Sequence, residues 1–73
     1  MIFSVWADWD DATHYLERKT NGICAWGRVC ARAAIFKSKA EAEAMAAAVS
    51  NPACDVNATI FRNEDAESRL AMA

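Results

Sequence analysis

Four side chains in this sequence could bind a zinc ion or act as nucleophile and base: His14, Cys24, Cys30 and Cys54. Zinc sites commonly contain cysteine pairs separated by about two to four residues. Here Cys24 and Cys30 are six positions apart, and Cys54 is distant from both. Free cysteine is among the most often buried residue types and packs as a small apolar side chain. We therefore predict no metal site and no cofactor.

A cysteine nucleophile would need a base such as His14 and a carboxylate to orient it. His14 could face Cys24 across a pair of strands. The sequence contains no glycine-rich nucleophile turn and no oxyanion motif, and so short a chain leaves little room for a substrate pocket. We expect that the protein is not an enzyme, and we assign no catalytic residue.

Segment 6–11 combines two tryptophans with three aspartates. In a regular strand Trp6 and Trp9 lie on opposite faces, and a small sheet with one helix cannot bury both faces. Exposed tryptophan is typical of interface hot spots, and carboxylates suit an Arg/Lys-rich partner surface. The alternative is that these tryptophans are core and the aspartates solubilise a loop. The candidate interface comprises Trp6, Asp8, Trp9, Asp10, Asp11 and Glu17.

Trp26 lies among basic residues in the sequence, namely Arg28, Arg32, Lys37 and Lys39. Aromatic and basic side chains together can bind single-stranded nucleic acid by stacking and charge. Ordinary solvated charge is the favoured interpretation, because ten acidic residues outnumber eight basic ones and the net charge is −2. This balance argues against direct nucleic-acid binding and against docking on an anionic membrane.

The length of 73 residues allows a single domain, residues 1–73. No apolar run approaches the roughly 20 residues of a membrane span, and the first residues lack the basic leader and apolar core of a signal peptide. An odd number of cysteines cannot pair completely within one chain, so we expect reduced thiols and a cytoplasmic location.

Alternating apolar residues predict strands over 1–9, 13–19, 23–29 and 54–62. The acidic run after residue 9 ends the first strand. Asn21-Gly22 predicts a hairpin with a type I′ turn, and Gly27 indicates a bulge or a close approach of backbone. Residues 30–36 fit either a helical turn or a strand.

Ser38 and Glu41 form a capping-box pattern that predicts a helix from residue 39 to about 49. Asn51-Pro52 ends it, because the residue before proline avoids the α region. Its apolar stripe is Ala42, Met45, Ala46 and Val49. A short C-terminal helix is expected over 64–72, with Asn63 as its cap. The fold class is α+β: an antiparallel sheet of about four strands with one alanine-rich helix packed on one face and a short C-terminal helix.

The stretch 31–48 resembles a pattern common in small phage-encoded proteins. There a hairpin with a central tryptophan leads to A-x-x-F-x-S-x-x-E-A, then a helix and a last strand; here the resemblance covers about residues 13–62. In size, charge and lack of a catalytic set the chain is similar to anti-CRISPR proteins. That resemblance implies a phage-type inhibitor, in the host cytoplasm, that binds a host protein or nucleoprotein complex with a basic surface, such as a CRISPR effector, and blocks nucleic-acid access.

The resemblance transfers no functional residue to this chain. Segment 6–11 lies outside the shared pattern, which is where we expect partner specificity to reside. The alternative function is a small homodimeric regulatory or nucleic-acid-binding accessory protein that uses the basic face.

Overall fold

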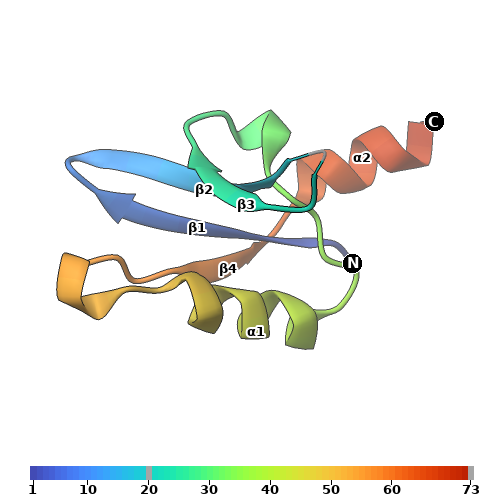
Figure 1. Ribbon diagram of the computed structural model, residues 1–73. Helices are drawn as coiled ribbons and strands as arrows, with labels where there is room; N and C mark the ends of the chain where they lie inside the picture. Colours follow the sequence, from blue (N-terminus) through green and yellow to red (C-terminus); the bar gives the residue numbers. More distant parts are fainter. Residues whose placement is uncertain (20, 73) are drawn as a thin grey trace.

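The fold is a four-stranded antiparallel sheet with a helix on each side, in a computed structural model that describes residues 1–19 and 21–72. The sheet order is β3-β2-β1-β4, and the molecule measures 40 × 24 × 23 Å. The strands are β1 (Phe3–Trp9), β2 (Ala12–Arg18), β3 (Cys24–Gly27) and β4 (Thr59–Arg62). Helices α1 (Lys39–Val49) and α2 (Glu64–Met72) lie on opposite sides of the sheet (Figure 1). The predicted α+β fold class is confirmed.

The turn between β1 and β2 consists of Asp10 and Asp11. Trp9 pairs with Ala12, and the two aspartates have φ values of 52° and 57°. Positive φ at both central positions is the signature of a two-residue type I′ turn, and aspartate is one of the few residue types that visits this region. The expectation that the acidic run only ends a strand therefore missed a hairpin.

The second hairpin joins β2 to β3, and its turn differs from the prediction. The Ile23 carbonyl accepts from the Lys19 N–H, and the Gly22 N–H donates to the Lys19 carbonyl. Gly22 has φ +85°, whereas Asn21 is not among the described residues with positive φ. The predicted type I′ turn at Asn21-Gly22 is wrong, because of these two residues the glycine alone has a positive φ, whereas a type I′ turn needs it at both central positions. The predicted strand pairing is confirmed between 15–18 and 24–27.

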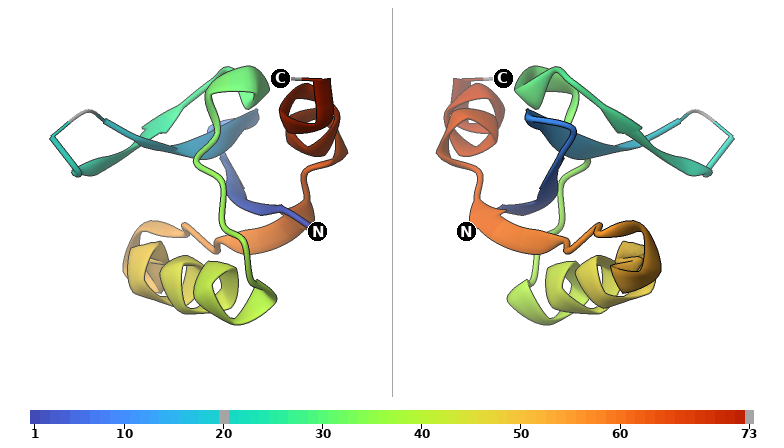
Figure 2. Two further views of the ribbon diagram at one scale, coloured as in Figure 1. Left: turned by 90° about the vertical axis from the view of Figure 1, so that its right-hand side faces the viewer. Right: turned by 90° about the vertical axis from the view of Figure 1, so that its left-hand side faces the viewer.

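Residues 30–36 carry the chain from one side of the sheet to the other (Figure 2). They begin with a short 3₁₀ helix, η1 (Cys30–Arg32). The Ala34 N–H then donates to the Leu16 carbonyl at 2.8 Å, and Phe36 exchanges two backbone hydrogen bonds with Phe3. The segment is thus a helical turn followed by an extended crossing, which explains why its pattern fitted both.

Helix α1 has the predicted bounds, and the Ser38 hydroxyl accepts a hydrogen bond from the Glu41 N–H at 3.1 Å. Alanines dominate its sheet-facing side, so it approaches the sheet closely. Met45 and Val49 from the predicted stripe are only partly buried against the core. The buried cluster comprises Val5, Leu16, Ala34, Phe36, Ala42 and Ala46.

The C-terminal third begins with a second 3₁₀ helix, η2 (Pro52–Cys54). Asn51 and Val56 exchange backbone hydrogen bonds, so the chain reaches the sheet only at Thr59. The predicted strand 54–62 is therefore too long at its start, because the proline favours a turn there. Helix α2 occupies the predicted residues. Among the described residues, neither helix has the length and hydropathy to cross a membrane.

Candidate functional site

One side of the sheet carries a row of aromatic rings that α1 does not cover. Trp6 pairs with Tyr15 across β1 and β2, and Ser4 pairs with Phe61 across β1 and β4. Paired residues point to the same face, so Trp6, Tyr15 and Phe61 share a face with Asp8. A cavity of about 340 Å³ opens there, lined by Trp6, Asp8, Thr13, Tyr15, Cys30 and Phe61.

Tyr15 contributes a phenol hydroxyl to the lining of this cavity. Its ring meets Phe61 edge to face, with centroids 6.0 Å apart. Burial raises the pKa of the Tyr15 phenol, and the Cys30 thiol and the Asp8 carboxylate raise it further. The phenol is neutral at physiological pH and can donate a hydrogen bond into the cavity, whose lining also includes Asp8, Thr13 and Cys30.

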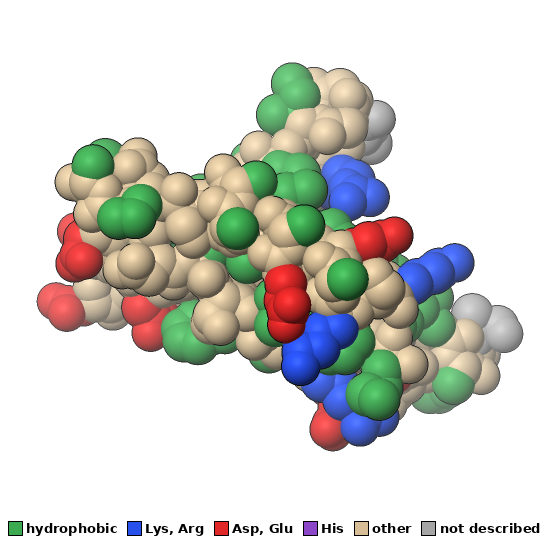
Figure 3. Space-filling model, turned by 90° about the horizontal axis from the view of Figure 1, so that it is seen from below, with side chains coloured by type: hydrophobic (Ala, Val, Ile, Leu, Met, Phe, Trp, Pro, Cys, Tyr) green, Lys and Arg blue, Asp and Glu red, His purple; other side chains and the backbone are tan. Residues whose placement is uncertain are grey.

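A second cavity, of about 440 Å³, lies at the β1–β2 turn and is acidic. Its lining is Asp8, Trp9, Asp10, Asp11, Ala12, Thr13 and Asp55. Asp55 comes from the end of η2, where its φ of 59° places it in the left-handed region. Seen from the α1 side, this end of the molecule shows acidic and no basic side chains (Figure 3, left). We call Asp8, Asp10, Asp11 and Asp55 the acidic end.

The two cavities share Asp8 and Thr13, so the aromatic and acidic surfaces are continuous. No ion pair within the described part of the chain involves a carboxylate of the acidic end. Unpaired carboxylates this close together repel one another, and a cationic partner relieves that repulsion. Sequence reasoning grouped Asp8, Asp10 and Asp11, but it missed Asp55, which is distant along the chain and gave no signal.

Trp9 lies on the other side of the sheet from Trp6, as predicted. Its indole stacks on the His14 imidazole and meets the Trp26 ring edge to face at 5.2 Å. All three tryptophans are partly exposed. Trp9 also lines the acidic cavity, so the aromatic surface of the hairpin continues around its tip.

Glu17 does not belong to the acidic end. It lies four residues along β2 from Thr13, about 13 Å at the usual strand rise, and is 8% exposed. Its carboxylate occupies the space where a side chain at Gly27 would begin, and it accepts a hydrogen bond from Lys19 Nζ at 3.3 Å. The close approach at Gly27 is thus made by the Glu17 side chain and not by backbone as predicted, and Glu17 is tied to the β2–β3 pair.

The cysteines lie on three different elements: Cys24 on β3, Cys30 on η1 and Cys54 on η2. In residues 1–19 and 21–72 no three His, Cys, Asp or Glu side chains are grouped to hold a metal ion. Cys24 pairs with Arg18, four positions along β2 from His14. The geometry thus does not bring the thiol and the imidazole together.

The residues of the alternative basic face around Trp26 do not share one side of the sheet. Arg28 and Arg32 lie near η1, whereas Lys37 and Lys39 lie at the start of α1, on the other side of the sheet. Trp26 packs against the core cluster.

Comparison of the chain with protein-family models, with curated proteins and with solved structures finds no significant match. The function must therefore be argued from the surface itself. A carboxylate beside three aromatic rings can hold a guanidinium or ammonium group by charge and by cation–π attraction.

Proposed function

We propose that this protein acts without catalysis, by docking its acidic end and adjoining aromatic cavity on a cationic surface of a partner. The partner is a protein or nucleoprotein complex that handles nucleic acid, and docking blocks nucleic-acid access. The resemblance to small phage-encoded inhibitors makes a CRISPR effector complex the first partner to test.

The observation that carries this proposal is the position of Asp8 between the two cavities. An arginine or lysine side chain of the partner entering the 340 Å³ cavity meets aromatic faces and the Asp8 carboxylate together. Neighbouring cations of the partner then face Asp10, Asp11 and Asp55. Such a surface presents clustered negative charge, as a nucleic acid does, and aromatic anchors supply the apolar contact area.

The test uses a variant that removes charge while keeping the turn. Asp10→Asn with Asp11→Gly creates Asn-Gly, the preferred pair for a type I′ turn, and adding Asp8→Asn removes the shared carboxylate. The matched control is Glu41→Gln with Glu43→Gln and Glu64→Gln, which removes three exposed charges elsewhere. Each protein is immobilised and used to capture partners from host lysate, and captured partners are challenged with nucleic acid.

We expect a partner that the wild type and the control retain and the aspartate variant loses, with affinity falling at least about tenfold. Nucleic acid must compete with the protein for that partner. Equal capture by the aspartate variant, or capture that nucleic acid leaves unchanged, would contradict the proposal.

A further inference from the structure

The aromatic cavity, of about 340 Å³, has one charged residue among the described residues that line it, and that residue is Asp8. Within residues 1–19 and 21–72 the Asp8 carboxylate takes part in no ion pair. Asp8 and Thr13 are exposed, whereas the rings of Trp6, Tyr15 and Phe61 are partly buried. A cation that enters the cavity therefore meets the carboxylate at the mouth and the aromatic rings beyond it.

The sheet and the ring contacts hold the aromatic side chains in place. Trp6 lies directly opposite Tyr15 in the β1–β2 pair, and the Cβ atoms of such a pair are about 5 Å apart. The Tyr15 and Phe61 rings meet edge to face, with planes at 69° and centroids 6.0 Å apart. Because these rings are constrained before anything binds, a ligand loses little affinity to ordering them.

The carboxylate lies close to the rings along one strand. Asp8 follows Trp6 by two positions on the same face of β1, which places the two residues about 7 Å apart at the usual strand rise. A guanidinium is flat: its face stacks on an aromatic ring while its N–H edge donates two hydrogen bonds to a carboxylate. One arginine side chain can therefore contact a ring and Asp8 at the same time.

A lysine ammonium fits this arrangement less well. It is compact and strongly hydrated, and its N–H groups find acceptors at the mouth, where Asp8 and Thr13 lie. Moving deeper against the rings removes its water without supplying new acceptors, which costs free energy. Lysine therefore gains the carboxylate contact and little of the aromatic contact.

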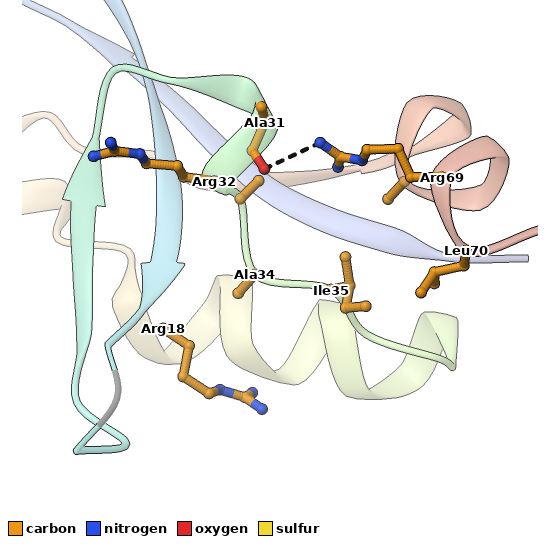
Figure 4. A pocket seen from close by; sticks show the side chains of 9 residues that line it. Arg18, Ala31, Arg32, Ala34, Ile35, Arg69 and Leu70 are labelled. Carbon is orange, nitrogen blue, oxygen red and sulfur yellow. Dashed lines mark hydrogen bonds between the residues drawn. The ribbon is translucent and has the colours of Figure 1, made fainter. Parts of the chain in front are cut away.

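The chain already contains one guanidinium held by an aromatic ring. The Arg18 guanidinium lies 5.3 Å from the centre of the Phe36 ring. In Figure 4 the Arg18 side chain points toward α1 and away from Arg69, whose Nη1 donates to the Ala31 carbonyl at 3.3 Å. The cavity of about 380 Å³ beside these residues thus has cations that diverge. In the aromatic cavity, by contrast, the charge and the rings occupy neighbouring positions on one sheet face.

We propose that the aromatic cavity is specific for an arginine side chain of the partner, and that it discriminates against lysine. The guanidinium stacks on the aromatic wall and donates to the Asp8 carboxylate. This inference rests on the proposed function, to which it adds the residue type that the partner must present at this point.

The test is an NMR titration of the ¹⁵N-labelled full chain with single amino acids blocked at both ends. The probes are N-acetyl-arginine methylamide and the corresponding lysine, trimethyl-lysine and citrulline compounds; citrulline keeps the shape of arginine without its charge. We expect arginine to give saturable shifts of the Trp6 indole N–H and of the amides of residues 6, 8, 13 and 15, with a Kd of roughly 1 to 30 mM. Lysine should bind at least about fivefold more weakly, and citrulline about tenfold, because its hydrogen bonds to Asp8 are no longer charge-assisted.

Variants decide whether the carboxylate and the ring are responsible. Asp8→Asn should weaken arginine binding about tenfold, and Trp6→Leu should weaken it several-fold. The matched control is Asp65→Asn, which removes an exposed carboxylate from α2, outside the cavity. It should change the Kd by less than about twofold, since exposed charges at that distance are largely screened. The dispersion of the amide spectrum verifies that each variant is folded.

Four results would overturn the specificity for arginine: no saturable shift with arginine, lysine binding as tightly as arginine, tighter binding of trimethyl-lysine, or equal weakening by Asp8→Asn and Asp65→Asn. None of them alters the outcome of the capture experiment, which measures docking of the whole partner. Conversely, selective arginine binding together with unchanged capture by the aspartate variant would contradict the proposed function and leave the specificity of the cavity standing.

Discussion

The Trp9 indole and the His14 imidazole lie face to face, with ring centroids 3.5 Å apart and planes within 2° of parallel. Because Ala7 is the residue paired with His14, the contact runs diagonally across β1 and β2. Diagonal aromatic pairs of this kind stabilise antiparallel hairpins. The stack therefore supports the hairpin whose tip carries Asp10 and Asp11.

His14 also destabilises the folded state to some extent, because its Nδ1 atom is buried and has no hydrogen-bond partner in the described part of the chain. We expect His14→Phe to keep the stack, remove that destabilisation and leave the free energy of unfolding unchanged or higher by up to about 1 kcal/mol. His14→Ala should lower it by about 1 kcal/mol, because the aromatic contact is lost. Urea melts followed by circular dichroism measure both. A stability loss in His14→Phe equal to that in His14→Ala would show that the imidazole nitrogen is needed.

Asn63 connects α2 to the interior through three consecutive hydrogen bonds. Its Oδ1 accepts from the Ala66 N–H at 3.0 Å, and its Nδ2 donates to Ser4 Oγ at 2.9 Å. The Ser4 hydroxyl donates in turn to the Ala34 carbonyl at 2.7 Å. Because Ser4 and Asn63 are 0% and 2% exposed, water cannot replace a missing partner.

Asn63→Ala should therefore lower the free energy of unfolding by about 2 kcal/mol, since it removes a helix cap and leaves a buried hydroxyl with one partner fewer. The exposed Asn57 provides the control, and Asn57→Ala should change stability by less than about 0.5 kcal/mol. Chemical denaturation measures the difference. Equal midpoints for the two variants would mean that α2 does not depend on this network.

Local patterns were sufficient to predict the helices. Ser38 and Asn63 are N-caps whose side-chain oxygens accept from the third helical N–H in each case, a relationship confined to four residues. The turns were harder. Asn-Gly is the strongest hairpin signal, yet the type I′ turn formed at Asp10-Asp11, because pairing in the sheet set the loop length and aspartate tolerated the backbone it required.

For the candidate site too, local patterns were predictable from the sequence and contacts between distant segments were not. Strand alternation placed Trp6 and Trp9 on opposite faces correctly. Alternation says nothing about which distant segment covers each face, so Asp55 and Cys30 could not be assigned to the cavities they line. Glu17 was wrongly grouped with the acidic run because it is near that run in sequence. In the strand it lies too far from the turn to join the acidic end.

Glu67 makes the stability of the N-terminal region depend on pH. Its carboxylate accepts from Arg62 and from the Ile2 N–H at 2.7 Å. The Arg62 hydrogen bonds, followed by the Ile2 contact, lower the pKa of the carboxyl below its ordinary 4.5. A lowered folded-state pKa contributes stability above the unfolded value, and that contribution is lost as pH falls through the folded value.

We therefore expect the wild type to be more stable than Glu67→Gln at pH 7, and the difference to shrink steadily as the pH is lowered below 4.5. The control is Glu64→Gln, also in the first turn of α2, whose difference from the wild type should vary less across this range. Thermal melts at a series of pH values provide the measurement. A constant difference between wild type and Glu67→Gln would rule out this linkage.

Ala42 tests how closely α1 lies against the sheet. The residue is completely buried, and with Ala46 it forms the helix surface that meets Val5 and Leu16. Leucine in its place must displace the helix or adopt a strained rotamer, so Ala42→Leu should lower the free energy of unfolding by about 2 kcal/mol. Ala44 lies on the exposed side of the same helix, and Ala44→Leu should change stability by less than about 0.5 kcal/mol, because the two residues have similar helix propensities. Met45, only partly buried at the edge of the contact, is a poorer reporter. If both leucine variants melt at the wild-type midpoint, the small side chains do not set the spacing between α1 and the sheet. The core would then have enough free volume beside Ala42 to accept a leucine side chain.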